Sequence, residues 1–69
     1  MEHLDVRGLS CPEPVVLLRR AMVSGAAAYQ VVADNLTCKE NVTRYAEHQG
    51  YQVACEEQGG EYTLTITKP

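Results

Sequence analysis

Polar and apolar residues alternate in four short segments, and the two longer segments between them repeat their apolar positions with helical spacing. Residues 3–7, 28–34, 51–55 and 62–66 follow the two-residue period of strands that expose one face to water. Residues 12–23 and 37–49 instead gather their apolar side chains on one side of a helix. The predicted order of elements is therefore β-α-β-α-β-β.

This pattern predicts a two-layer α/β sandwich of the α+β kind, with two helices on one face of a four-stranded mixed sheet. Each strand has one polar face and each helix has one apolar face, so a single layer of helices over the sheet buries both. Thr37 and Glu40 fit a capping box that would begin the second helix, and Gly50 would end it. Gln58-Gly59-Gly60 is predicted to form the loop of a final hairpin.

The helical wheels separate core positions from surface positions. The predicted core side of the first helix holds Pro14, Val15, Leu18, Ala21 and Met22. That of the second holds Cys38, Val42, Tyr45 and Ala46. Val16 falls outside the apolar side of the first helix, among three charged residues: Glu13, Arg19 and Arg20.

Length and composition indicate one globular domain spanning residues 1–69. The chain has 69 residues, of which 45% are hydrophobic and 22% charged. A formal net charge of −3 opposes direct binding to nucleic acid, which requires a basic face. The longest apolar run, residues 15–18, is far shorter than the roughly 20 residues of a membrane span. The sequence stops just after the last predicted strand, which leaves room for a longer parent protein with this as its N-terminal domain.

Three cysteines, Cys11, Cys38 and Cys55, cannot pair completely within one chain. Their spacing contains no C-x-x-C pair, so neither a zinc site nor a dithiol redox motif is indicated. Free thiols fit a reducing compartment, and we expect the protein to be cytoplasmic. Cys38 lies on the apolar side of its helix and Cys55 shares the inward alternation of its strand, so both are predicted to be core residues.

Cys11 stands where the chain enters the first helix. At such a position, unpaired backbone N–H groups and the positive helix end favour the nucleophilic thiolate. We expect Gly8, Pro12 and Pro14 to shape the turn. The alternative is a small buried side chain at a helix start. Neither His3 nor His48 is predicted to lie near Cys11 as a base, which favours reactions in which sulfur attacks sulfur.

The segment from Leu4 to Val15 resembles the signature of the TusA/SirA/YedF family of small sulfur carriers. It contains the D-x-x-G-L sequence followed by C-P-x-P, with Cys11 as the first residue of that motif. Residues 31–35 are similar to the acidic turn after the second strand of the family, although Asn35 stands where TusA members tend to have a second acidic residue. Residues 41–51 resemble the YedF-like branch most.

The resemblance implies a carrier that accepts sulfane sulfur as a persulfide on Cys11 and relays it to an acceptor protein, in tRNA thiolation or in sulfur or selenium metabolism. Such a carrier has no turnover of its own and needs no metal or organic cofactor. Its partners would be a sulfur donor such as a cysteine desulfurase and a protein acceptor, with no nucleic acid or membrane involved. A docking face is expected beside Cys11, made of Glu13, Val16, Arg19 and Arg20. The alternative is a binding or regulatory module that uses the Cys11-Pro12-Glu13-Pro14 turn for docking without moving sulfur.

Overall fold

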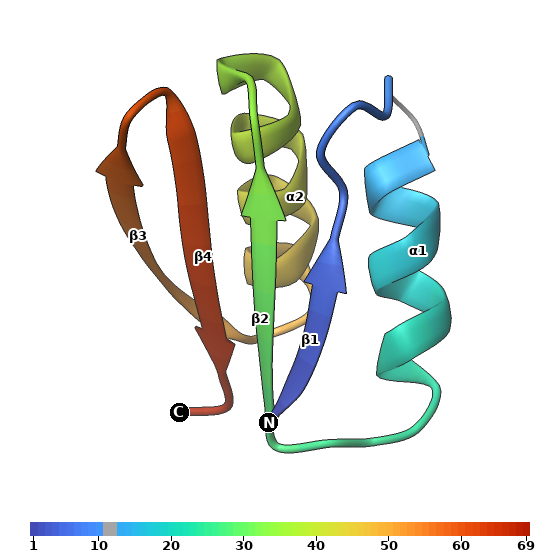
Figure 1. Cartoon of the computed structure of the whole chain (residues 1–69). Coiled ribbons are helices and arrows are strands. Elements are labelled where there is room, and N and C mark those ends of the chain that lie inside the picture. Colours follow the sequence, from blue (N-terminus) through green and yellow to red (C-terminus); the bar gives the residue numbers. More distant parts are fainter. Residues whose placement is uncertain (11–12) are drawn as a thin grey trace.

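The computed structural model describes residues 1–10 and 13–69, and the predicted order of elements is confirmed. The strands are β1 (Glu2–Asp5), β2 (Ala28–Ala33), β3 (Gln52–Gln58) and β4 (Glu61–Thr67). The helices are α1 (Glu13–Met22) and α2 (Leu36–His48), as shown in Figure 1.

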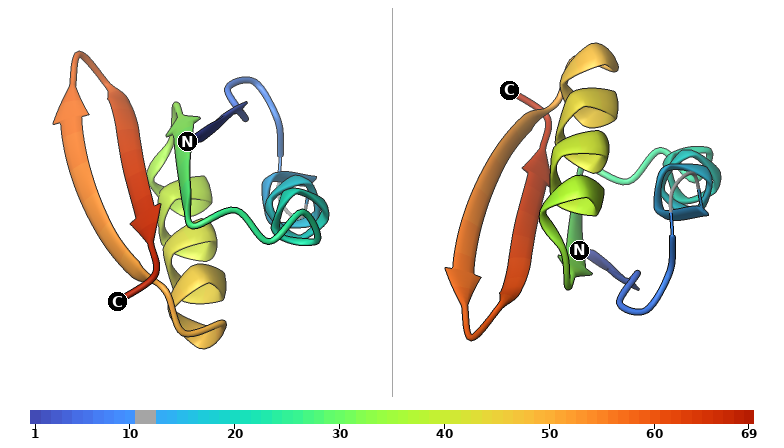
Figure 2. Two further views of the ribbon diagram at one scale, coloured as in Figure 1. Left: turned by 90° about the horizontal axis from the view of Figure 1, so that it is seen from below. Right: turned by 90° about the horizontal axis from the view of Figure 1, so that it is seen from above.

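The four strands form one mixed sheet in the order β1-β2-β4-β3. β1 and β2 are parallel, and the other two pairs are antiparallel. Both helices lie on the same face of the sheet, which confirms the two-layer prediction (Figure 2). Because β1 and β2 are parallel and each leads into a helix, α1 and α2 begin at the same end of the sheet, where β1 and β2 have their carboxyl ends (Figure 1).

The core lies between the sheet and the helices and follows the predicted alternation. In β2 the buried side chains are those of Tyr29, Val31 and Ala33. The Tyr29 hydroxyl donates to the Ala21 carbonyl oxygen at 3.2 Å, which ties the end of α1 to the sheet. The other fully buried apolar side chains come from three further elements and from the residue after β1: Val6, Pro14, Leu18, Val42, Ala46, Leu64 and Ile66.

The start of α2 differs from the predicted capping box. The helix begins at Leu36, and Asn35 is its N-cap, with Oδ1 accepting the Cys38 N–H at 2.8 Å. The short Asn35 side chain reaches the third helical residue from an extended backbone, so the helix starts before Thr37. Thr37 is exposed in the first turn, and the prediction that it caps the helix is wrong.

The length of the hairpin strands and the exposure of Cys55 also differ from the predictions. Gly59 and Gly60 have φ of 60° and 81°, as a two-residue type I′ turn requires, so β3 and β4 extend farther than predicted. The prediction that Cys55 is a core residue is wrong, because its side chain is exposed. β3 is an edge strand, and the hairpin end stands away from α2, so the inward alternation there meets no helix (Figure 2).

Candidate functional site

The segment before Cys11 lies at the end of the sheet where both helices begin. Gly8 has φ of 76°, a left-handed conformation that favours glycine, and its N–H donates to Asp34 Oδ2 at 2.9 Å. This bond joins the loop after β1 to the loop after β2. The predicted turn role of Gly8 therefore has a conformational reason. The predictions for Cys11 and Pro12 fall outside the described residues.

Leu9 is held from two sides. Its N–H donates to the Val6 carbonyl oxygen at 3.3 Å, and its own carbonyl oxygen accepts from Cys38 Sγ at 3.4 Å. The Leu9 side chain also packs against the core. Cys38 is 2% exposed, so its predicted burial is confirmed, but sequence reasoning missed its bond to this segment. The closeness of Leu9 and Cys38 depends on how two separate strands pair, which no local pattern reveals.

Helix α1 begins next to this segment. The Glu13 N–H donates to the Ser10 carbonyl oxygen at 3.0 Å, which ties the start of α1 to this segment. Pro14 is buried in the first turn, where its missing N–H leaves no intrahelical bond unmade. The helix ends at Met22, one residue earlier than predicted, and Val23 is 86% exposed.

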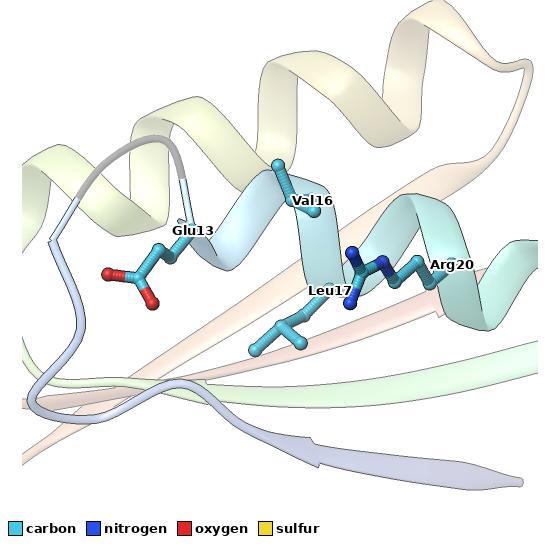
Figure 3. A pocket seen from close by; sticks show the side chains of 4 residues that line it. All are labelled: Glu13, Val16, Leu17 and Arg20. Atoms are coloured by element: carbon cyan, nitrogen blue, oxygen red, sulfur yellow. The ribbon is translucent and has the colours of Figure 1, made fainter.

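A shallow depression of about 230 Å³ runs along α1. Four side chains line it, from Glu13, Val16, Leu17 and Arg20 (Figure 3). They occupy positions i, i+3, i+4 and i+7, which form one stripe along a helix. The stripe has a carboxylate at one end, a guanidinium at the other and two apolar side chains between them. Three of the four residues predicted for the docking face thus come together here.

The structure changes the prediction for three positions on α1. Arg19 is exposed but does not line the depression, because position i+6 lies off the stripe. Val16 is half-buried, whereas the wheel predicted a solvent-facing side chain. Leu17 was absent from the predicted face, although its i+4 spacing from Glu13 was a signal that could have identified it.

The Arg7 side chain forms two ion pairs near the end of β1. Its guanidinium contacts Asp5 Oδ2 at 2.8 Å and Glu61 Oε2 at 3.1 Å, so it reaches from the end of β1 to the start of β4. The hydrogen bonds from Arg7 lower the pKa of Asp5 to about 2, and the two carboxylates raise the pKa of Arg7. These two carboxylates therefore hold the Arg7 cation at this end of the sheet.

The two histidines lie away from the end of the sheet where both helices begin. His3 and His48 are both exposed, and His48 is at the far end of α2 from its N-cap. Within residues 1–10 and 13–69, no three His, Cys, Asp or Glu side chains are grouped to hold a metal ion. Neither α1 nor α2 is long and apolar enough to cross a membrane.

Comparison with known proteins identifies the family. The model of the family described as "Sulfurtransferase TusA" matches residues 2–68. The chain belongs to the TusA family of sulfur carriers. It is 35% identical over 71 residues to a candidate sulfur carrier of Methanocaldococcus jannaschii, covering 99% of this chain and 95% of the relative. It is 26% identical over 68 residues to the sulfur carrier protein TusA of Pseudomonas entomophila, covering 94% of this chain and 85% of that one.

The fold of this TusA-family chain also matches a solved structure. The crystal structure of a SirA-like protein from Desulfitobacterium hafniense superposes with a TM-score of 0.88 at 32% sequence identity. The match covers 97% of this chain and 96% of the other. The resemblance to the TusA and SirA proteins stated from the C-P-x-P segment is thus confirmed over nearly the whole chain.

Proposed function

We propose that this protein is a cytoplasmic sulfur carrier that holds sulfane sulfur as a persulfide on Cys11. The observation that carries the proposal is the placement of residues 8–10. They precede Cys11 directly in the sequence and lie at the end of the sheet where both helices begin. Helix N-termini present unpaired N–H groups and a positive potential, which favour a thiolate. We therefore expect the pKa of Cys11 to lie below the ordinary thiol value, by a modest amount because Glu13 opposes it.

The proposed transfer needs no oxidant or cofactor. The Cys11 thiolate attacks the outer sulfur of the donor's persulfide, a new S–S bond forms, and the donor leaves as its thiolate. An acceptor thiolate then attacks the outer sulfur of the Cys11 persulfide, and Cys11 leaves as a thiolate in turn. Because each step exchanges one S–S bond for another, the carrier returns to its starting state only when a second protein removes the sulfur. It has no turnover of its own.

We further propose that the stripe on α1 is the docking face for these partners. Small apolar side chains flanked by charges of opposite sign suit a transient interface, since rim charges orient the partner and the apolar centre excludes water. The facing surface would place a cation near Glu13 and an anion near Arg20. A cysteine desulfurase is the proposed donor and a second thiol protein the proposed acceptor.

Intact mass spectrometry tests the carrier proposal. The protein is incubated with a cysteine desulfurase and cysteine, then measured before and after a thiol reductant. A carrier gains the mass of one sulfur, about 32 Da, and loses it on reduction. If the desulfurase binds the protein but the mass stays constant, the docking-module alternative is correct and the carrier proposal is wrong.

A further inference from the structure

The start of α2 is connected to residues 8–10 through the buried thiol of Cys38. Its Sγ lies 3.4 Å from the Leu9 carbonyl oxygen and 3.3 Å from Asn35 Nδ2. A carbonyl oxygen only accepts and an amide nitrogen only donates, so the single S–H points to Leu9 and the sulfur accepts from Asn35. The direction of the second bond therefore depends on which end of the Asn35 amide faces the sulfur.

The orientation of that amide follows from its other contacts. Asn35 Oδ1 accepts the Cys38 N–H at 2.8 Å, so the opposite end of the amide must be nitrogen. That nitrogen also donates to Asp34 Oδ1 at 3.2 Å, while Asp34 Oδ2 accepts the Gly8 N–H at 2.9 Å. Two chains of hydrogen bonds thus run from one amide group to the loop before Cys11, one ending at Leu9 and one at Gly8.

We propose that Asn35 is a positioning residue for the reaction of Cys11, acting through Cys38 on Leu9 and through Asp34 on Gly8. This inference rests on the proposed function, in which Cys11 carries the sulfur. Leu9 is two residues before Cys11 in the sequence, so only Ser10 separates this restrained residue from the nucleophile. In this chain asparagine serves both purposes, because its Oδ1 caps α2 while its Nδ2 donates to Cys38 and Asp34.

Two substitutions separate the donor role of Asn35 from its cap role. Serine and aspartate at this position each keep an oxygen that accepts the Cys38 N–H, so Asn35→Ser and Asn35→Asp both retain the N-cap of α2. Aspartate loses both amide N–H donors, and serine replaces them with a single O–H, which cannot donate to Cys38 and Asp34 at once. In Asn35→Asp the carboxylate also competes with the Leu9 oxygen for the S–H of Cys38 and repels Asp34. Thr37→Asp is the matched charge control, because Thr37 is exposed in the same helical turn.

The first readout is amide hydrogen exchange at Gly8 and Leu9, which reports directly on the loop. We expect exchange to be about fivefold faster in Asn35→Ser and Asn35→Asp than in wild type, the factor that corresponds to losing one hydrogen bond of ordinary strength. The second is the pH profile of Cys11 alkylation by iodoacetamide, whose midpoint should rise toward that of an ordinary thiol in both variants. Thr37→Asp should leave the exchange rates unchanged.

The pattern across the variants decides the question. If Asn35→Ser has wild-type exchange and a wild-type alkylation profile, the positioning role is wrong. If Asn35→Asp and Thr37→Asp shift the profile equally and Asn35→Ser does not, charge alone explains the effect and the proposal also fails. These readouts use no sulfur donor, so a wild-type protein that takes up no sulfur would overturn the proposed function while the exchange result still judges the role of Asn35.

Discussion

Val16 offers the sharpest test of the docking face, because it contributes to the depression on α1 without belonging to the buried core. The proposed change is Val16→Asp, which places a carboxylate between Glu13 and Arg20. Valine and aspartate have similar helix propensities, so the backbone of α1 contributes little to any difference. The substitution therefore tests the surface and leaves the helix itself nearly unchanged.

The expected cost in stability follows from the partial burial of Val16. A fully buried valine contributes about 1.5–3 kcal/mol, so a half-buried one should cost on the order of 1 kcal/mol when lost. For a domain of this size that corresponds to a fall in Tm of about 4–8 °C. Leu18→Ala is the control for a core position on the same helix. Leu18 is 0% exposed, and its truncation should cost about 2–5 kcal/mol, which is several times the effect of Val16→Asp.

The functional assay compares a reaction that needs docking with one that does not. Sulfur transfer from a cysteine desulfurase to Val16→Asp should slow by about tenfold, the factor that corresponds to about 1.4 kcal/mol of lost interface energy. Alkylation of Cys11 by iodoacetamide should stay near the wild-type rate. If transfer keeps its wild-type rate, the stripe is not the docking face. If Tm falls as far as in Leu18→Ala, Val16 is part of the core and the assignment of the helix faces is wrong.

Three further predictions follow from named contacts. Arg20→Ser should slow sulfur transfer and weaken its salt dependence, whereas Arg19→Ser, which lies off the depression, should do so less; equal effects in a stopped-time transfer assay would contradict the stripe. Gly8→Ala should destabilise the fold by about 1–2 kcal/mol, measured by urea unfolding, because an added Cβ meets no atom within 4 Å and only the left-handed φ is penalised. Arg7 lowers the pKa of Asp5, so the stability this pair adds is complete above the ordinary carboxyl pKa and is lost as the pH falls toward about 2. Tm measured against pH should show a shallower acid decline in Asp5→Asn, and identical curves would contradict the pairing.

The order of elements, the sheet and the core of β2 could be predicted from the sequence because they depend on local periodicity. Tyr29, Val31 and Ala33 alternate without exception, and the structure buries all three. Cys55 follows the same alternation, yet it is exposed, because burial also requires a covering element and β3 extends past α2 at the sheet edge. Alternation predicts which face a side chain takes but not whether that face is covered.

Only part of the candidate site could be predicted from the sequence. The stripe on α1 was largely predictable, since helical spacing alone groups Glu13, Val16 and Arg20. The hydrogen bonds that reach the loop before Cys11 were not, because Cys38 and Asn35 approach Leu9 only when two parallel strands bring their following loops together. Their sequence separation leaves no local signal, and Asn35 by itself reads only as a turn residue or a cap.

The position of the transferred sulfur is the central claim, and peptide mapping tests it most directly. Trypsin separates the three cysteines, because cleavage after Arg7, Arg19, Arg20, Lys39 and Arg44 places Cys11 in residues 8–19, Cys38 in residues 21–39 and Cys55 in residues 45–69. The protein is loaded by a cysteine desulfurase, blocked with iodoacetamide and digested. We predict an additional sulfur, about 32 Da, on the 8–19 peptide, with the peptides of Cys38 and Cys55 carrying the alkyl group alone. Sulfur recovered on the 21–39 or 45–69 peptide instead of the 8–19 peptide would contradict the assignment of Cys11 as the carrier.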